Sequence, residues 1–315
     1  MRWKVLVSAP YMQPVIDRFR PLFAEQNIEL FVPPVKERFE EEDLLQWMHD
    51  IDGVIAGDDR FTSRVLEASP KLKVISKWGT GIDSFDQEAC QRLGIAICNT
   101  PNAFSEPVAD SVLGYILCFA RQLPWMDKYM KNNGWHKMPG RALNESVLGV
   151  IGVGNVGKAV VRRAKAFGLR ILGNDPVIPS TEFIRESKIE MVERDTLLAQ
   201  ADFVSLNCDL NPTSHHLMNA RAFHQMKQSA ILINTARGPI VHEEALVAAL
   251  QQGQLAGAAL DVFEHEPLPA DSLLYQMDNV LLAPHNSNSS PAAWERVHQN
   301  TIKNLLEELN RKSNG

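Results

Sequence analysis

The chain has 315 residues, of which 45% are hydrophobic and 22% are charged, and its formal net charge is −6 at pH 7. The length is sufficient for two domains, and the mild acidity gives no reason to expect a nucleic acid or an anionic membrane as a partner. No apolar run approaches the length of a membrane span, and the run at 3–9 is typical of a first strand rather than of a signal peptide. Four scattered cysteines (Cys90, Cys98, Cys118 and Cys208) show no metal-ligand spacing, so we expect reduced thiols, no metal and a cytoplasmic location.

The first hundred residues alternate between strand and helix patterns. Short apolar runs predict strands at 3–9, 28–32, 53–56, 72–76 and 95–98. Helices are expected between them, around 14–25, 44–48, 63–68 and 84–93. This alternation predicts a parallel sheet with both faces covered, although no phosphate-binding motif accompanies it.

The stretch from Val147 to Asp175 carries the clearest motif. An apolar run at 147–151 predicts a buried strand, and Gly152, Gly154 and Gly157 then open a helix in a G-x-G-x-x-G pattern. The first glycine permits a tight turn, the second lets backbone approach a pyrophosphate, and the third lets helix and strand pack closely. The helix N-terminus favours the anion, and the carboxylate of Asp175, after the next predicted strand, favours the ribose of NAD over the phosphorylated ribose of NADP. The alternative is a βαβ turn without a ligand.

The rest of the chain extends this unit into a complete dinucleotide-binding domain. One long helix is expected at 105–131, with a kink at Leu123-Pro124, before a polar segment at 132–146. Further strands are predicted at 203–206, 230–233, 258–260 and 280–282, and helices around 195–200, 219–227 and 242–251. That makes about six strands in the second sheet.

We therefore expect an α/β protein with two Rossmann-like or flavodoxin-like doubly wound parallel-sheet domains and a ligand cleft between them. A last helix at about 291–311 follows the second sheet and most simply returns to the first domain. The substrate-binding domain is predicted to comprise residues 1–100 and 285–315, and the NAD-binding domain residues 101–284.

Three residues follow predicted strands and could take part in a reaction at the carboxyl ends of those strands. Arg237 could bind a carboxylate and a carbonyl in a bidentate manner, although a surface arginine is the alternative. His285 could exchange a proton near neutral pH, and a nearby Glu266 would orient its ring and raise its pKa. Most histidines are structural, and the sequence does not establish that Glu266 and His285 meet.

A second candidate site is the loop Lys77–Gly81, which follows a predicted strand. Its backbone N–H groups could bind a carboxylate and Lys77 would add charge, whereas an ordinary βα turn is the alternative. The adjacent histidines His215 and His216 lack ligand spacing, so we interpret them as loop residues and not as a metal site.

Six segments together resemble the D-isomer-specific 2-hydroxyacid dehydrogenase family, most closely its phosphoglycerate dehydrogenase branch. They are SKWGTGIDSFD, NTPNAFSEPVAD, LGVIGVGNVGK, NTARGPIVHEEAL, GAALDVFEHEP and APH. The resemblance implies that Arg237 binds and polarises a 2-keto acid, that His285 transfers the proton, and that Glu266 tunes His285. It also implies that backbone from Trp78 through Gly79 and Thr80 to Gly81 holds the substrate carboxylate. Implied cofactor contacts are Thr80, Gly152, Gly154, Asn155, Val156, Gly157, Asp175, Cys208, Pro212, Thr235, Ala236 and Asp261, the last of these to the carboxamide.

The resemblance also implies NAD as cofactor and a homodimer formed through the helix near 105–131. Two departures from the family pattern lie near the implied cofactor site. Asn174 stands where an aromatic residue is common, and Asn286–Ser289 stand where apolar and small residues are common.

Substrate and activity are expected as follows. We predict D-3-phosphoglycerate as the substrate, because Lys77 could meet a phosphate. Reduction of glyoxylate, hydroxypyruvate or another small 2-keto acid is the alternative. An NAD(H)-sensing corepressor-like binding protein is the alternative from another class, and an α/β protein with a vestigial site is a third.

Overall fold

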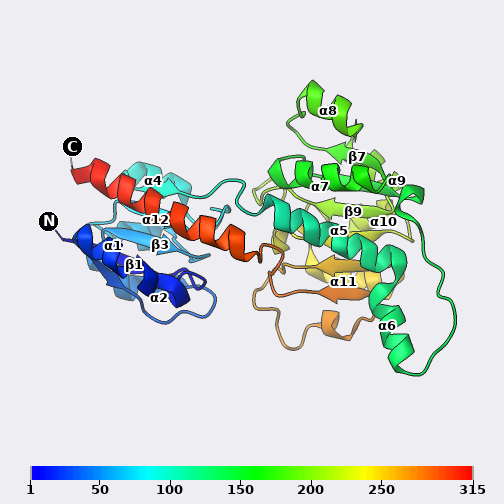
Figure 1. Cartoon of the computed structure of the whole chain (residues 1–315), viewed down its shortest axis with the longest axis horizontal. Helices are drawn as coiled ribbons and strands as arrows, with labels where there is room; N and C mark the ends of the chain where they lie inside the picture. Colours follow the sequence, from blue (N-terminus) through cyan, green and yellow to red (C-terminus); the bar gives the residue numbers. More distant parts are fainter. Residues whose placement is uncertain (1, 314–315) are drawn as a thin grey trace. The chain divides into compact units, whose positions relative to one another are not determined.

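The computed structural model describes residues 2–313, which fold into two compact units (Figure 1). Unit 1 comprises Met1–Phe104 and Ser290–Gly315, and unit 2 comprises Ser105–Ser289. The observed bounds lie within five residues of the predicted ones. The difference matters for His285, which was predicted to fall in the first domain but belongs to unit 2.

Unit 1 is a flavodoxin-like sheet of five parallel strands in the order β2-β1-β3-β4-β5. The strands are β1 (Trp3–Val7), β2 (Ile28–Phe31), β3 (Gly53–Ala56), β4 (Val74–Lys77) and β5 (Ala96–Cys98). All five strands predicted for this part of the chain are present. Three helices pack with β1, β3 and β4 in one core: α2 (Glu41–Trp47), α3 (Ser63–Glu67) and α4 (Gln87–Leu93). A 3₁₀ helix (Gln13–Arg18) and α1 (Arg20–Glu25) occupy the segment predicted as one helix, and α1 packs beside β2.

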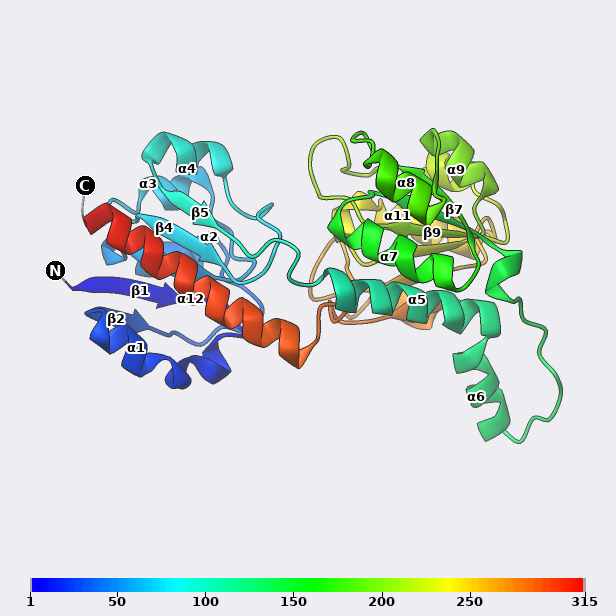
Figure 2. The same ribbon diagram turned by 45° about the horizontal axis from the view of Figure 1, so that its top comes forward.

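The C-terminal helix α12 (Pro291–Ser313) returns to unit 1, as expected, and packs on β3, β4 and β5 (Figure 2). Its buried residues recur at helical spacing and include Val297, Ile302 and Leu305. The helix is also tied to the end of β4, since the Ser76 hydroxyl donates to the Thr301 carbonyl at 2.8 Å.

Unit 2 is a doubly wound sheet of seven parallel strands in the order β12-β11-β10-β9-β6-β7-β8. The strands are β6 (Val147–Ile151), β7 (Arg170–Asn174), β8 (Glu190–Met191), β9 (Phe203–Leu206), β10 (Ile231–Asn234), β11 (Gly257–Leu260) and β12 (Val280–Leu282). The order reverses between β6 and β9, which is where ligands bind in open sheets of this kind. The prediction of about six strands omitted β8, which is only two residues long.

Helices cover both faces of the unit 2 sheet, so each face has its own apolar core (Figures 1 and 2). The helices α5 (Ser105–Arg121), α7 (Asn155–Ala166) and α8 (Thr181–Ser187) share one core. The helices α9 (Arg194–Gln200), α10 (Ala220–Gln225) and α11 (Glu243–Gln251) share the other. The sequence prediction had omitted α8.

The predicted single helix at 105–131 is wrong, because α5 ends at Arg121 and a separate helix, α6 (Leu123–Lys131), follows. Gln122 between them is left-handed with φ 53°. In a continuous helix the Ala120 carbonyl would accept from residue 124, but Pro124 has no N–H. The Arg141 N–H donates to that carbonyl instead, at 2.8 Å.

Among the described residues, no helix is both long and apolar enough to cross a membrane.

Candidate active site

The glycine-rich turn joins β6 to α7 at the switch point of the unit 2 sheet. Gly152 has φ +87°, and a Cβ there would lie 2.5 Å from the Cys208 nitrogen. A Cβ on Gly157 would lie 2.0 Å from the Gly152 carbonyl oxygen, whereas a Cβ on Gly154 would meet no heavy atom within 4 Å. The first and third glycines therefore permit close backbone packing, and the second leaves open space at the N-terminus of α7. This arrangement fits a pyrophosphate held by helix N–H groups.

Asp175 follows β7 directly and faces this turn. One of its carboxylate oxygens accepts from the Val153 N–H at 2.6 Å, and the other accepts from the Val177 N–H at 2.7 Å. Each oxygen has a further lone pair, so the carboxylate is held in place and can still accept from a ribose hydroxyl. The unusual Asn174 donates to the Val192 carbonyl at 3.0 Å and so braces the sheet edge.

The segments after β9 and β10 carry a second group of the predicted cofactor residues. The Thr235 hydroxyl is buried and has no hydrogen-bond partner among the described residues. Buried polar groups are normally paired, so this hydroxyl fits a group that binds a ligand. Cys208 is partly buried, and burial raises the pKa of its thiol to about 11. Pro212 is exposed on the loop after β9.

The three predicted catalytic residues lie at the carboxyl ends of adjacent strands. Arg237 follows β10, Glu266 follows β11 and His285 follows β12. Nδ1 of His285 lies 3.0 Å from a carboxylate oxygen of Glu266, so the two residues meet. The other oxygen of Glu266 accepts from the Phe263 N–H at 3.0 Å, which fixes the carboxylate. Both side chains are about one-third exposed, His285 at 32% and Glu266 at 28%, so the His285 ring is accessible to a ligand while Glu266 holds its Nδ1.

Two residues whose structural roles the sequence did not reveal hold this edge together. The Asn234 side chain accepts from the Ala236 N–H and donates to the Arg237 carbonyl, bracing the turn that carries Arg237. Asp261, predicted only as a cofactor contact, accepts from the N–H groups of Asn286 and Ser287 at 2.7 and 2.9 Å. Its carboxylate therefore fixes the backbone beside His285, which is left-handed with φ 49°. A polar residue at the end of a buried strand was the available signal in both cases.

The other predicted residues lie in unit 1, where Lys77 is the last residue of β4 and the residues up to Gly81 form the loop after it. The Trp78 indole N–H donates to Nδ1 of His298 on α12 at 2.9 Å, and burial lowers the pKa of that histidine. The Thr80 hydroxyl donates to the Thr100 carbonyl at 3.0 Å. Lys77 differs most from expectation, because its side chain is 4% exposed and its Nζ lies 3.0 Å from Oδ1 of Asp58.

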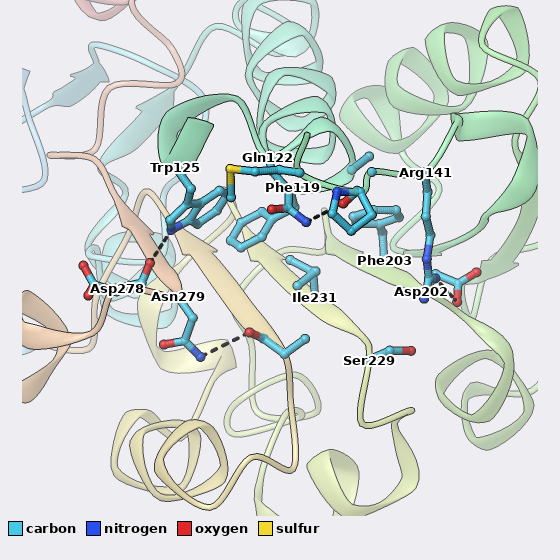
Figure 3. A pocket seen from close by; sticks show the side chains of 15 residues that line it. Phe119, Gln122, Trp125, Arg141, Asp202, Phe203, Ser229, Ile231, Asp278 and Asn279 are labelled. Atoms are coloured by element: carbon cyan, nitrogen blue, oxygen red, sulfur yellow. Dashed lines mark hydrogen bonds and ion pairs between the residues drawn. The ribbon is translucent and has the colours of Figure 1, made fainter. Parts of the chain in front are cut away.

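A separate cavity of about 560 Å³ lies at the amino ends of the unit 2 strands, whereas the candidate site lies at their carboxyl ends (Figure 3). It is lined by residues at the amino ends of strands, including Phe203, Ile231 and Asn279, and by Phe119 and Arg141. None of the predicted site residues lines it, so it is not part of the candidate active site.

Known proteins resemble this chain along most of its length. The model of the D-isomer specific 2-hydroxyacid dehydrogenase, NAD binding domain, matches residues 113–287. The chain is 35% identical over 314 residues to a hydroxypyruvate reductase of Thermotoga maritima, which covers 98% of this chain and 99% of that protein. It is 40% identical over 294 residues to a D-3-phosphoglycerate dehydrogenase of Methanocaldococcus jannaschii, which covers 92% of this chain but 54% of that protein. The D-lactate dehydrogenase of Aquifex aeolicus, solved with NAD and lactic acid, matches with a TM-score of 0.85 at 26% identity, covering 98% and 97% of the two chains.

The doubly wound sheet, its glycine-rich turn and the acid after β7 define a dinucleotide-binding oxidoreductase. The chain belongs to the D-isomer-specific 2-hydroxyacid dehydrogenase family. The predicted fold class, the NAD cofactor and the assignment as an NAD-dependent dehydrogenase are confirmed at this level.

Proposed function

We propose that Arg237, Glu266 and His285 interconvert a D-2-hydroxy acid and its 2-keto acid at the carboxyl edge of the unit 2 sheet. NAD, when bound, supplies or accepts the hydride at C2 of the substrate. In reduction, His285 gives a proton to the carbonyl oxygen as the hydride arrives at C2, and in oxidation it takes that proton back. Arg237 binds the substrate carboxylate and polarises the carbonyl.

The observation that carries this proposal is the 3.0 Å contact between Nδ1 of His285 and Glu266. A carboxylate that binds Nδ1–H fixes the tautomer and orients the ring, which leaves Nε2 as the nitrogen that exchanges a proton with substrate. The carboxylate also stabilises the imidazolium form that reduction requires.

We propose a small unphosphorylated 2-keto acid, hydroxypyruvate or glyoxylate, as the preferred substrate. The sequence favoured 3-phosphoglycerate because Lys77 could supply a cation for a phosphate. The burial of Lys77 and its pairing with Asp58 remove that argument, since a phosphate would have to displace a carboxylate from a nearly inaccessible ammonium group. D-3-Phosphoglycerate stays a second candidate, supported by the 40% identity to a D-3-phosphoglycerate dehydrogenase.

A substrate panel tests both candidates. Purified protein with NADH is offered glyoxylate, hydroxypyruvate, pyruvate and 3-phosphohydroxypyruvate separately, and the loss of NADH absorbance is followed. The proposal predicts the highest kcat/KM with hydroxypyruvate or glyoxylate. A preference for the phosphorylated acid that Lys77→Met abolishes would instead establish the second candidate.

We further propose a homodimer formed through α5, α6 and the segment after them. This part of unit 2 exposes large apolar side chains, including Leu123, Met130 and Trp135, the last at 86%. Large apolar side chains exposed along one segment favour an interface there. Light scattering on wild type and on Leu123→Ser/Trp135→Ser tests this, because the double variant should be monomeric.

A cytoplasmic location stays a prediction.

A further inference from the structure

Glu264 lies two residues before Glu266 on the loop after β11, and its carboxylate joins two other segments of unit 2. One oxygen lies 2.5 Å from Nε2 of His216, on the segment after β9. The other oxygen accepts from the Glu243 N–H at 3.0 Å, and the Glu243 carboxylate in turn accepts from the Glu264 N–H at 3.2 Å. The loop is thus tied on one side to the start of α11 and on the other to His216.

The segment that carries His216 is itself bound to the turn after Arg237. The His216 N–H donates to the Pro239 carbonyl at 2.8 Å, and the Met218 N–H donates to the Ile240 carbonyl at 3.0 Å. His216 is left-handed with φ 50°, and its ring packs between those of His215 and His242, with centroid distances of 3.9 and 4.6 Å.

The two loops that carry Arg237 and Glu266 also touch each other directly. A Cβ on Gly238 would lie 1.8 Å from the Phe263 carbonyl oxygen and 2.5 Å from the Glu264 nitrogen. Since Phe263 also donates its N–H to Glu266, a movement of this stretch would move the carboxylate that orients His285.

We infer that Glu264 and His216 are positioning residues, whose hydrogen bond holds the Glu266 loop against the turn that carries Arg237. The inference rests on the roles proposed above for Arg237, Glu266 and His285. Neither His216 nor Glu264 need touch substrate for this role. Displacing a catalytic group by about 1 Å can reduce a rate by about 100-fold.

The surroundings of the pair determine which variants are informative. The partly buried Glu243 faces Glu264, and His215, His242 and His265 lie around the cluster or next to it in the chain. Desolvation by burial raises the pKa of Glu243, and the charge of Glu264 raises it further. Charge changes at Glu264 therefore also affect Glu243, so the cleaner perturbation is at His216.

The test compares His216→Leu, which removes the donor, with His216→Gln, whose amide can still donate to Glu264. His224→Leu on α10 is the matched control, since His224 is exposed and lies outside the cluster. We expect His216→Leu to lower kcat by about 10- to 100-fold, and His216→Gln to stay within about threefold of wild type. The Kd for NADH, measured by fluorescence, should change by less than about threefold in both.

The inference is overturned if His216→Leu keeps a wild-type kcat, or if His216→Gln loses as much as His216→Leu. Should His216→Leu fail to fold, Glu264→Gln replaces it, because its amide oxygen still accepts from the Glu243 N–H while the contact with His216 is weakened, although the lost charge also reaches Glu243. Glu266→Gln is measured in parallel. Wild-type turnover in Glu266→Gln refutes the proposed function, whereas a loss there beside full activity in His216→Leu refutes this inference alone.

Discussion

Substitution of the second glycine of the turn separates cofactor binding from folding. Gly154 has φ −74° and ψ −151°, which alanine can adopt, and its added Cβ would meet nothing within 4 Å. We therefore expect Gly154→Ala to lower the free energy of unfolding by no more than about 1 kcal/mol, the cost of alanine at a helix N-cap. The methyl group would occupy the open space above the N-terminus of α7, where the pyrophosphate is expected.

The loss should appear in cofactor binding instead. A displaced pyrophosphate should weaken NADH binding by about 10- to 100-fold, which corresponds to about 1.4–2.7 kcal/mol. Gly157→Ala is the contrasting variant, because its Cβ would lie 2.0 Å from the Gly152 carbonyl oxygen and overpacking against backbone costs about 1–3 kcal/mol. Urea unfolding and NADH fluorescence titration measure both quantities. Wild-type NADH affinity in Gly154→Ala, or greater destabilisation than in Gly157→Ala, would contradict the role assigned to Gly154.

Three further predictions concern cofactor preference, the catalytic edge and unit 1. Asp175→Asn should raise the kcat/KM for NADPH relative to NADH by about tenfold or more, since the charge that repels the extra phosphate is lost; an unchanged ratio would contradict the assigned role. Gly238→Ala should lower kcat/KM by about 100-fold through displacement of the Phe263 backbone, whereas Gly114→Ala, where a Cβ meets nothing within 4 Å, should leave activity intact. Because burial lowers the pKa of His298 in the folded state, the unfolded chain binds the extra proton below about pH 6.5. The free energy of unfolding should therefore fall as the pH drops from about 8 to 5, and His298→Gln should flatten that dependence in urea titrations.

The strands of both sheets were predictable because each central strand is a mostly apolar run with helical patterns on either side. The sequence could not reveal β8, since two residues carry no periodicity. It also could not show that α5 ends at Arg121, because the Ala120 carbonyl finds its donor in Arg141, twenty-one residues along the chain. Long-range contacts of this kind override local helix propensity.

The sequence predicted which residue types form the candidate site, but it did not predict all of the site's geometry. Motif order placed Arg237, Glu266 and His285 after adjacent strands, but only the fold shows that Glu266 reaches Nδ1 of His285. Lys77 shows the opposite case. A cation in a loop suggested a phosphate ligand, whereas the parallel pairing of β3 with β4 brings Asp58 to its ammonium group.

The His285→Ala variant tests most directly whether His285 transfers the proton while NAD binds independently of it. Steady-state reduction of the best keto acid from the panel is measured alongside NADH affinity for wild type and variant. We expect kcat to fall by about 100-fold or more while the Kd for NADH stays within about threefold. Full turnover in His285→Ala would contradict it.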